Sequence, residues 1–87
     1  MTRAELIEQI KKKQSYLCVG LDVDYEKMPA HLQDKSYSLS TFVREIVDAT
    51  RDYSVAYKFN LAFYEGMGVD YFEEFEELVY EMPNDCL

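Results

Sequence analysis

The chain is organised around residues 54–65, which read SVAYKFNLAFYE and hold a single basic residue, Lys58, among apolar and aromatic side chains. Such side chains favour the pleated, half-buried surface of a sheet. An apolar run between two helical patterns is typical of a core strand in a parallel sheet. Residues 54–60 are therefore predicted to form a strand, on which Lys58 and Asn60 point to the same side.

Lys58 is the residue of this strand that most needs an explanation. Burying its ammonium is costly unless a partner balances the charge. One interpretation places Lys58 and Asn60 at the C-terminal end of the strand, in a ligand site. The other is that the methylene chain of Lys58 lies along the strand and carries its ammonium into solvent. The residues alone leave both interpretations open.

The chain before this strand predicts a helix and then another strand. Residues 2–14 have a capping box of Thr2 and Glu5 at the start and three lysines at the end, where they complement the helix dipole. Residues 16–21, YLCVGL, are apolar throughout, and we expect a strand that is covered on both faces. Asp22 and Asp24 follow it, and such a pair can bind hydroxyls or a metal, or simply begin a loop.

Two connections are predicted to be irregular. Residues 23–37 show no clear period, and we expect a long loop that carries His31 on its surface. Residues 61–68 contain Gly66 and Gly68, which permit turns, and are expected to form a second connection.

Two further helices follow from the apolar spacing. One is capped by Ser38 or Ser40 and extends to about residue 52. The other begins at Asp70, has Glu73 as a capping-box partner, and ends before a proline. Its predicted apolar face consists of Phe72, Phe75, Leu78, Val79 and Met82. After a turn, residues 86–87 predict the start of another strand.

Strands that alternate with helices imply parallel pairing and right-handed crossovers. Two strands do not complete a sheet, and the chain has 87 residues. We therefore predict an α/β chain that forms the N-terminal part of a (β/α)8 TIM barrel, a fold that needs ~250 residues. It comprises an N-terminal helix and the first two βα units, so residues 1–87 form a single partial domain.

Charge and cysteine usage narrow the partners and the compartment. The net charge is −8, and residues 59–87 hold eight acidic residues and no basic one, so nucleic acid is not an expected partner. Cys18 and Cys86 match no metal or disulfide spacing and are interpreted as buried thiols in a reducing cytosol. We expect no membrane span and no signal peptide, and hence a cytoplasmic location without membrane partners.

Two motifs together resemble one family. CVGLDVD at 18–24 and YKFNLAFYE at 57–65 resemble the first and second barrel strands of orotidine 5′-phosphate decarboxylase, in its longer bacterial subgroup. The resemblance covers essentially the whole chain, and the second motif is the more specific. It implies decarboxylation of orotidine 5′-monophosphate to uridine 5′-monophosphate, the last step of de novo pyrimidine synthesis. It also implies that no cofactor or metal is used and that the full-length enzyme is a homodimer.

The resemblance assigns roles by position. Asp22 matches the aspartate that binds the ribose or base region of the substrate. Lys58 matches the catalytic lysine that binds a ribose hydroxyl and joins the charge network, and Asn60 matches an expected substrate contact. Phe59 stands where the family commonly has proline, a tolerable departure. The family's third-strand DxKxxD motif, with the proton-donating lysine, would lie beyond Leu87, so the 87 residues are expected to be inactive alone.

Two alternatives to this family remain open. A magnesium-dependent sugar-phosphate synthase or decarboxylase of the same superfamily shares the first-strand aspartate but usually has glutamate on the second strand, and Lys58 argues against it. The second alternative, of another class, is a non-catalytic acidic interaction module that uses Tyr71, Phe72 and Phe75 to bind a partner. A truncated fragment of the enzyme is a further possibility. Aromatic residues at helical spacing are more often a core face. The sequence that follows Leu87 would discriminate between these readings.

Overall fold

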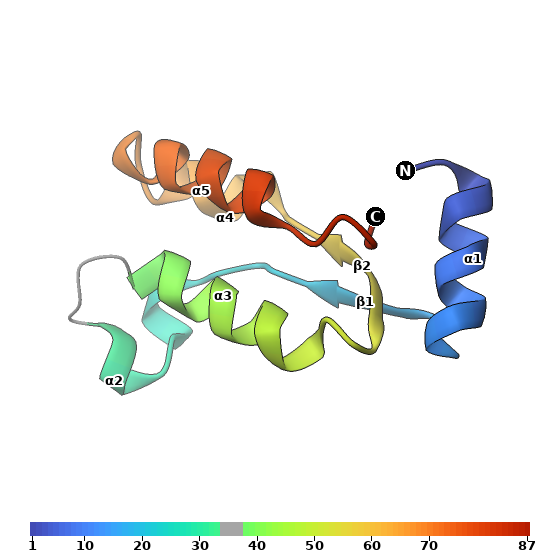
Figure 1. Ribbon diagram of the computed structural model, residues 1–87. Coiled ribbons are helices and arrows are strands. Elements are labelled where there is room, and N and C mark those ends of the chain that lie inside the picture. Colours follow the sequence, from blue (N-terminus) through green and yellow to red (C-terminus); the bar gives the residue numbers. More distant parts are fainter. Residues whose placement is uncertain (34–37) are drawn as a thin grey trace.

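The computed structural model describes residues 1–33 and 38–87, and Figure 1 shows how their elements are arranged. The elements are α1 (Arg3–Lys13), β1 (Leu17–Gly20), the 3-10 helix η1 (Tyr25–Lys27), α2 (Ala30–Gln33), α3 (Ser38–Thr50), β2 (Ser54–Lys58), α4 (Leu61–Gly66) and α5 (Asp70–Glu81). β1 and β2 pair in parallel. This confirms the predicted α/β class and the parallel pairing of the two strands. Two strands do not form a closed barrel, so the barrel stays a prediction.

Helix α1 begins as the sequence predicts. The Glu5 amide donates to the Thr2 hydroxyl at 3.2 Å, and the Glu5 carboxylate accepts from the Thr2 amide, which completes the capping box. Gln14 ends the helix in the left-handed region, at φ 52°. No residue of α1 is buried, and the helix stands apart from the others at the end of the sheet where the strands begin (Figure 1).

The two strands are covered on one face only. Val19 and Tyr57 turn toward the helices and pack against the core, whereas Cys18 and Gly20 on β1 are exposed. The prediction that residues 16–21 would be covered on both faces is therefore wrong. So is the prediction of two buried thiols, because Cys18 is exposed and Cys86 is half-buried. The physical reason is that the helices pack on one side of the sheet and leave the other side open.

The hydrophobic core lies between the covered face of the sheet and the helices. Its buried members are Leu21, Val23, Met28, Leu32, Leu39, Val43, Val47, Tyr64 and Leu78. Burial of such side chains stabilises the fold by about 25 cal/mol per Å² of apolar surface. The predicted face of α5 is confirmed for Leu78, Phe75 and Met82, whereas Phe72 and Val79 stay 43% and 44% exposed.

Both predicted irregular connections contain helix. The first holds η1 and α2, with His31 exposed as predicted, and residues 34–37 of that connection lie outside the described residues. The second is mostly α4, because the Asn60 side chain accepts a hydrogen bond from the Ala62 amide at 3.3 Å and caps a new helix. Long sequences without clear periodicity thus formed short helices that are stabilised by local caps and by burial of Tyr64.

The predicted caps of the two long helices are not formed. Ser38 and Ser40 lie inside α3, and Glu74 of α5 accepts hydrogen bonds from the Ser40 amide, at 3.0 Å, and from the Ser40 hydroxyl. In α5 the N-cap position is Val69, and no side chain caps the helix. Gly68, at φ 106°, turns the chain so that Asp70 already lies within the helix. α3 also ends at Thr50, slightly before the predicted limit.

Leu87 lies beside β2 as a further parallel neighbour. Its amide donates to the Val55 carbonyl at 2.9 Å, and its carbonyl accepts from the Tyr57 amide at 2.9 Å. Leu87 thus bonds to the residues on either side of Ala56, which is the hydrogen-bond pattern of parallel strands. These two bonds are consistent with the predicted start of a strand at residues 86–87, although the sheet in the described residues consists of β1 and β2. No helix within residues 1–33 and 38–87 is long and apolar enough to span a membrane.

Candidate functional site

The C-terminal ends of β1 and β2 place two charged side chains beside each other. The Leu21 amide, just after β1, donates to the Lys58 carbonyl at 2.8 Å, so the two strands end at the same level. Asp22 follows directly, and its Oδ1 lies 3.4 Å from Lys58 Nζ. The structure therefore brings together two of the three residues predicted to form a site.

This ion pair is open to solvent, because the side chains of Lys58 and Asp22 are 61% and 37% exposed. Lys58 reaches water, as one interpretation predicts, and also meets a carboxylate beyond the strand end, as the other requires. Water screens such a pair, so it contributes at most about 1 kcal/mol to stability. An ammonium carries three donors and a carboxylate only accepts, so together they can bind a diol: Lys58 donates to one hydroxyl while Asp22 accepts from another.

Asn60, the third predicted site residue, lies at the same end of the sheet. Its side-chain oxygen accepts from the Ala62 amide and is used as the cap of α4. Within the described part of the chain, its amide nitrogen makes no hydrogen bond and remains a donor. Asn60 makes no hydrogen bond to either member of the ion pair.

Asp24 serves the loop. Its Oδ1 accepts from the Glu26 amide at 3.1 Å, and its Oδ2 lies 3.8 Å from Lys27 Nζ. The second aspartate after β1 thus caps the turn that leads into η1, which is one of its two predicted roles. In the described ranges, no three His, Cys, Asp or Glu side chains gather closely enough to form a metal-binding group.

Tyr64 is part of this region, although the sequence analysis did not single it out. Its side chain is fully buried, and its hydroxyl donates to the carbonyl of Leu21, the residue before Asp22. Burial raises the pKa of Tyr64 well above its usual range, and the negative charge of Asp22 adds to this. Its position in an apolar run could have indicated a buried tyrosine, and a buried hydroxyl needs a hydrogen-bond partner.

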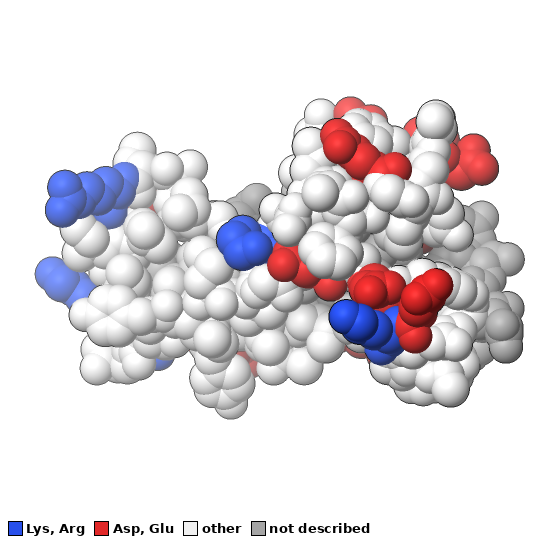
Figure 2. Space-filling view, turned by 180° about the vertical axis from the view of Figure 1, so that it is seen from behind, with Lys and Arg blue, Asp and Glu red and all other residues white. Residues whose placement is uncertain are grey.

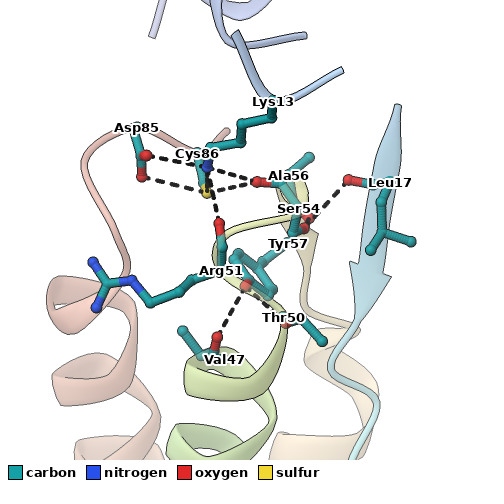
Figure 3. A network of polar contacts seen from close by, with 10 residues as sticks. All are labelled: Lys13, Leu17, Val47, Thr50, Arg51, Ser54, Ala56, Tyr57, Asp85 and Cys86. Carbon is teal, nitrogen blue, oxygen red and sulfur yellow. Dashed lines mark hydrogen bonds and ion pairs between the residues drawn. The ribbon is translucent and has the colours of Figure 1, made fainter. Parts of the chain in front are cut away.

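A second polar network lies at the opposite end of the strands, as Figure 3 shows. The side chain of Lys13 is only 8% exposed, and its ammonium donates to the carbonyls of Arg51, at 3.0 Å, and Ser54, at 2.9 Å. It also pairs with Asp85 at 3.1 Å. Lys13 lies in the last turn of α1, as predicted, and in addition takes part in this network.

Cys86 belongs to that network. Its thiol donates to the Ser54 carbonyl at 3.3 Å and lies 3.6 Å from Lys13 Nζ. Burial raises the pKa of Cys86 despite the nearby ammonium, so the thiol stays protonated near neutral pH. A protonated thiol is a weak nucleophile, and Cys86 is not a candidate for chemistry.

Acidic side chains gather at the end of the molecule away from α1, as Figure 2 shows. Residues 59–87 contribute eight acidic residues and no basic one to the chain. Of the aromatic residues of α5, Tyr71 and Phe75 pack against the core, whereas Phe72 and Tyr80 are exposed. The ring centroid of Phe75 lies 4.7 Å from that of Tyr64 and 5.3 Å from that of Phe59. The aromatic stripe is thus mainly a core face, with Phe72 as its exposed member.

The chain is similar to bacterial orotidine 5′-phosphate decarboxylases. It is 54% identical over 79 residues to that of Bacteroides fragilis strain YCH46, which covers 91% of this chain and 29% of the relative. It is 52% identical over 79 residues to the protein of Parabacteroides distasonis, and this alignment covers 91% of this chain and 28% of the relative. It is 56% identical over 70 residues to the protein of Christiangramia forsetii, and this alignment covers 80% of this chain and 26% of the relative.

The chain spans less than a third of the length of these relatives and corresponds to an N-terminal portion of them. This confirms the resemblance inferred from the two motifs. No protein-family model and no solved structure matches the chain.

Proposed function

We propose that this chain is the N-terminal part of an orotidine 5′-phosphate decarboxylase, which converts orotidine 5′-monophosphate to uridine 5′-monophosphate and carbon dioxide. The observation that carries the proposal is the Asp22–Lys58 pair, 3.4 Å apart beyond the ends of two parallel strands. The names of relatives at about half identity support the same activity. The active sites of (β/α)8 barrels lie at this end of the strands.

In this proposal, Lys58 is the catalytic residue of the segment and also binds substrate. Its ammonium donates to a ribose hydroxyl, and Asp22 accepts from the ribose or base region. Asn60 offers its free amide nitrogen as a third contact. In the complete site, further carboxylates hold Lys58 charged, since nearby negative charge favours the protonated form. A fixed cation of this kind also preorganises the field around the carbanion that develops as carbon dioxide leaves.

The remaining parts of the proposal concern the full-length protein. Leu87, bonded beside β2, supports a third parallel strand, and the resemblance places the DxKxxD motif on it. We propose a complete TIM barrel, a homodimer and a cytoplasmic location. The acidic surface of residues 59–87 supports a protein that does not bind nucleic acid.

The test is a decarboxylation assay on the full-length protein encoded by the gene that contains this chain. Loss of orotidine 5′-monophosphate is followed by ultraviolet absorbance, with and without a metal chelator. We expect equal activity in both, because Lys58 supplies the positive charge that a metal would otherwise provide. Activity that is lost with chelator and restored by magnesium would contradict the proposal and favour the sugar-phosphate alternative.

Reading the gene beyond Leu87 separates the proposal from the interaction-module alternative. We expect a DxKxxD motif within roughly ten residues, because strands in such units follow their helices after short loops. Continued acidic, non-periodic sequence without that motif would argue against the enzyme. The packing of Phe75 in the core already removes much of the surface that the alternative requires.

A further inference from the structure

We propose that Tyr64 is a positioning residue, whose hydroxyl holds the backbone on which Asp22 is placed opposite Lys58. This inference rests on the proposed function and adds a residue to its site. Tyr64 does not reach the open face of the sheet itself. It acts from the core, through the carbonyl of Leu21.

The backbone before Asp22 is held on both sides. The Leu21 amide donates to the Lys58 carbonyl at 2.8 Å, and the Leu21 carbonyl accepts from the Tyr64 hydroxyl. The Leu21 carbonyl and the Asp22 amide belong to the same planar peptide unit. Fixing that carbonyl therefore fixes the plane from which the Asp22 side chain departs. The same residue, Leu21, links this plane to the strand that carries Lys58.

The ion pair does not supply this order itself. Asp22 and Lys58 are both substantially exposed, and exposed ion pairs hold their side chains only weakly. The order has to come from the buried layer beneath them. There the Tyr64 ring is fully buried and packs against Phe59 and Phe75, with ring centroids 5.7 and 4.7 Å away.

Tyr64 acts as a neutral donor. Burial, and then the charge of Asp22, raise its pKa, so the hydroxyl keeps its proton throughout the pH range in which enzymes usually operate. A donor that never ionises can orient a carbonyl but does not exchange protons with substrate. Its effect should therefore not change with pH within that range.

The experiment compares two Tyr→Phe variants of the full-length protein. Tyr64→Phe removes the hydroxyl that bonds to Leu21. Tyr57→Phe is the matched control, because its hydroxyl also bonds to a backbone carbonyl, that of Val47 at 3.3 Å, but lies against α3, away from the site. We expect Tyr64→Phe to lower kcat/KM about tenfold, since small misplacements of reacting groups are costly. Tyr57→Phe should stay within about twofold.

A double-mutant cycle shows whether Tyr64 acts through Asp22. In the Asp22→Asn background, Tyr64→Phe should have little further effect on kcat/KM, because the group that it positions is already lost. The ratio between wild type and Tyr64→Phe should also stay constant from about pH 6 to pH 9, as a neutral donor requires. If the Tyr64 hydroxyl only stabilised the fold, the losses in kcat/KM from Tyr64→Phe and Asp22→Asn would be additive. The loss from Tyr64→Phe would then also equal that from Tyr57→Phe.

Tyr64→4-aminophenylalanine keeps a donor in the same place and should restore kcat/KM to within about twofold of wild type. This variant also serves if Tyr64→Phe does not fold. Equal losses in Tyr64→Phe and Tyr57→Phe, additive losses with Asp22→Asn, or no rescue by the amino analogue would each overturn the inference. A wild-type protein without decarboxylase activity is a different result, which overturns the proposed function and this inference with it.

Discussion

The ammonium of Lys13 lies 2.9 Å from the carbonyl of Ser54, the first residue of β2. Together with the bond to Arg51 and the ion pair with Asp85, this contact ties the end of α1 to the start of the sheet. Since no residue of α1 belongs to the hydrophobic core, these polar bonds are an important link between that helix and the rest of the chain.

Replacing Lys13 should therefore destabilise the full-length protein. Lys13→Met keeps the aliphatic stem but leaves two carbonyls and Asp85 without their donor, and we expect a loss of about 2 kcal/mol in the free energy of unfolding. Denaturant unfolding measures it. Lys12→Met is the control, because Lys12 is exposed on the same helix. Equal effects of the two substitutions would show that the network contributes nothing.

The ion pair between Lys13 and Asp85 makes the stability of the protein depend on pH. Burial is the largest single effect on Lys13 and opposes its charge, but the hydrogen bonds and charges of Asp85 and Cys86 together outweigh it and raise the pKa of Lys13 above its ordinary 10.5. The hydrogen bond from Lys13 lowers the pKa of Asp85 below its ordinary 3.8. The Lys13 contribution is thus complete below 10.5 and is lost as pH rises through its folded pKa. The Asp85 contribution is complete above 3.8 and is lost as pH falls through its folded pKa.

Asp85→Asn tests this directly. The difference in Tm between wild type and variant should be largest between these two limits and should shrink on either side of them. Thermal melts across the pH range supply the measurement. A difference that is independent of pH would mean that the Lys13–Asp85 pair carries no net ionic stabilisation.

Lys58→Ala should remove most of the activity of the full-length protein and leave its fold intact. The loss of one charge-assisted contact in a preorganised site costs ~10²–10³-fold in kcat/KM. Because Lys58 is largely exposed, its Tm should change little. Lys27→Ala removes a more exposed lysine, also next to an aspartate, and should be nearly silent. Unchanged kinetics in Lys58→Ala would reduce Lys58 to a strand-end lysine.

The 87 residues in isolation should melt broadly or form soluble aggregates, and should show no decarboxylase activity. One face of the sheet is open, and Tyr16 beside β1 is 85% exposed. Apolar surface left in water costs ~25 cal/mol per Å², and open strand edges favour association. Calorimetry and light scattering provide the measurement. A sharp two-state melt of a monomer would show that the segment forms a complete core by itself.

Features that depend on neighbours along the chain were predictable from the sequence. The capping box of Thr2 and Glu5 joins residues three apart, and the helix and strand periods identified both strands of the sheet. Parallel pairing followed from their alternation with helices. Asp22 and Lys58 were both predicted at strand ends, but the ion pair between them was not predicted, and the tertiary structure shows it.

Features that depend on residues far apart in the sequence were decided by the tertiary structure alone. Three consecutive lysines end α1, yet only Lys13 turns toward Asp85 and the start of β2, because helical geometry gives each position its own direction. Likewise, Glu74 serves the first turn of α3 because α5 packs beside it. Tyr64 reaches Leu21 because α4 folds back over the sheet. A local pattern specifies which backbone a segment adopts, but a hydrogen bond or ion pair forms only where packing brings donor and acceptor within reach.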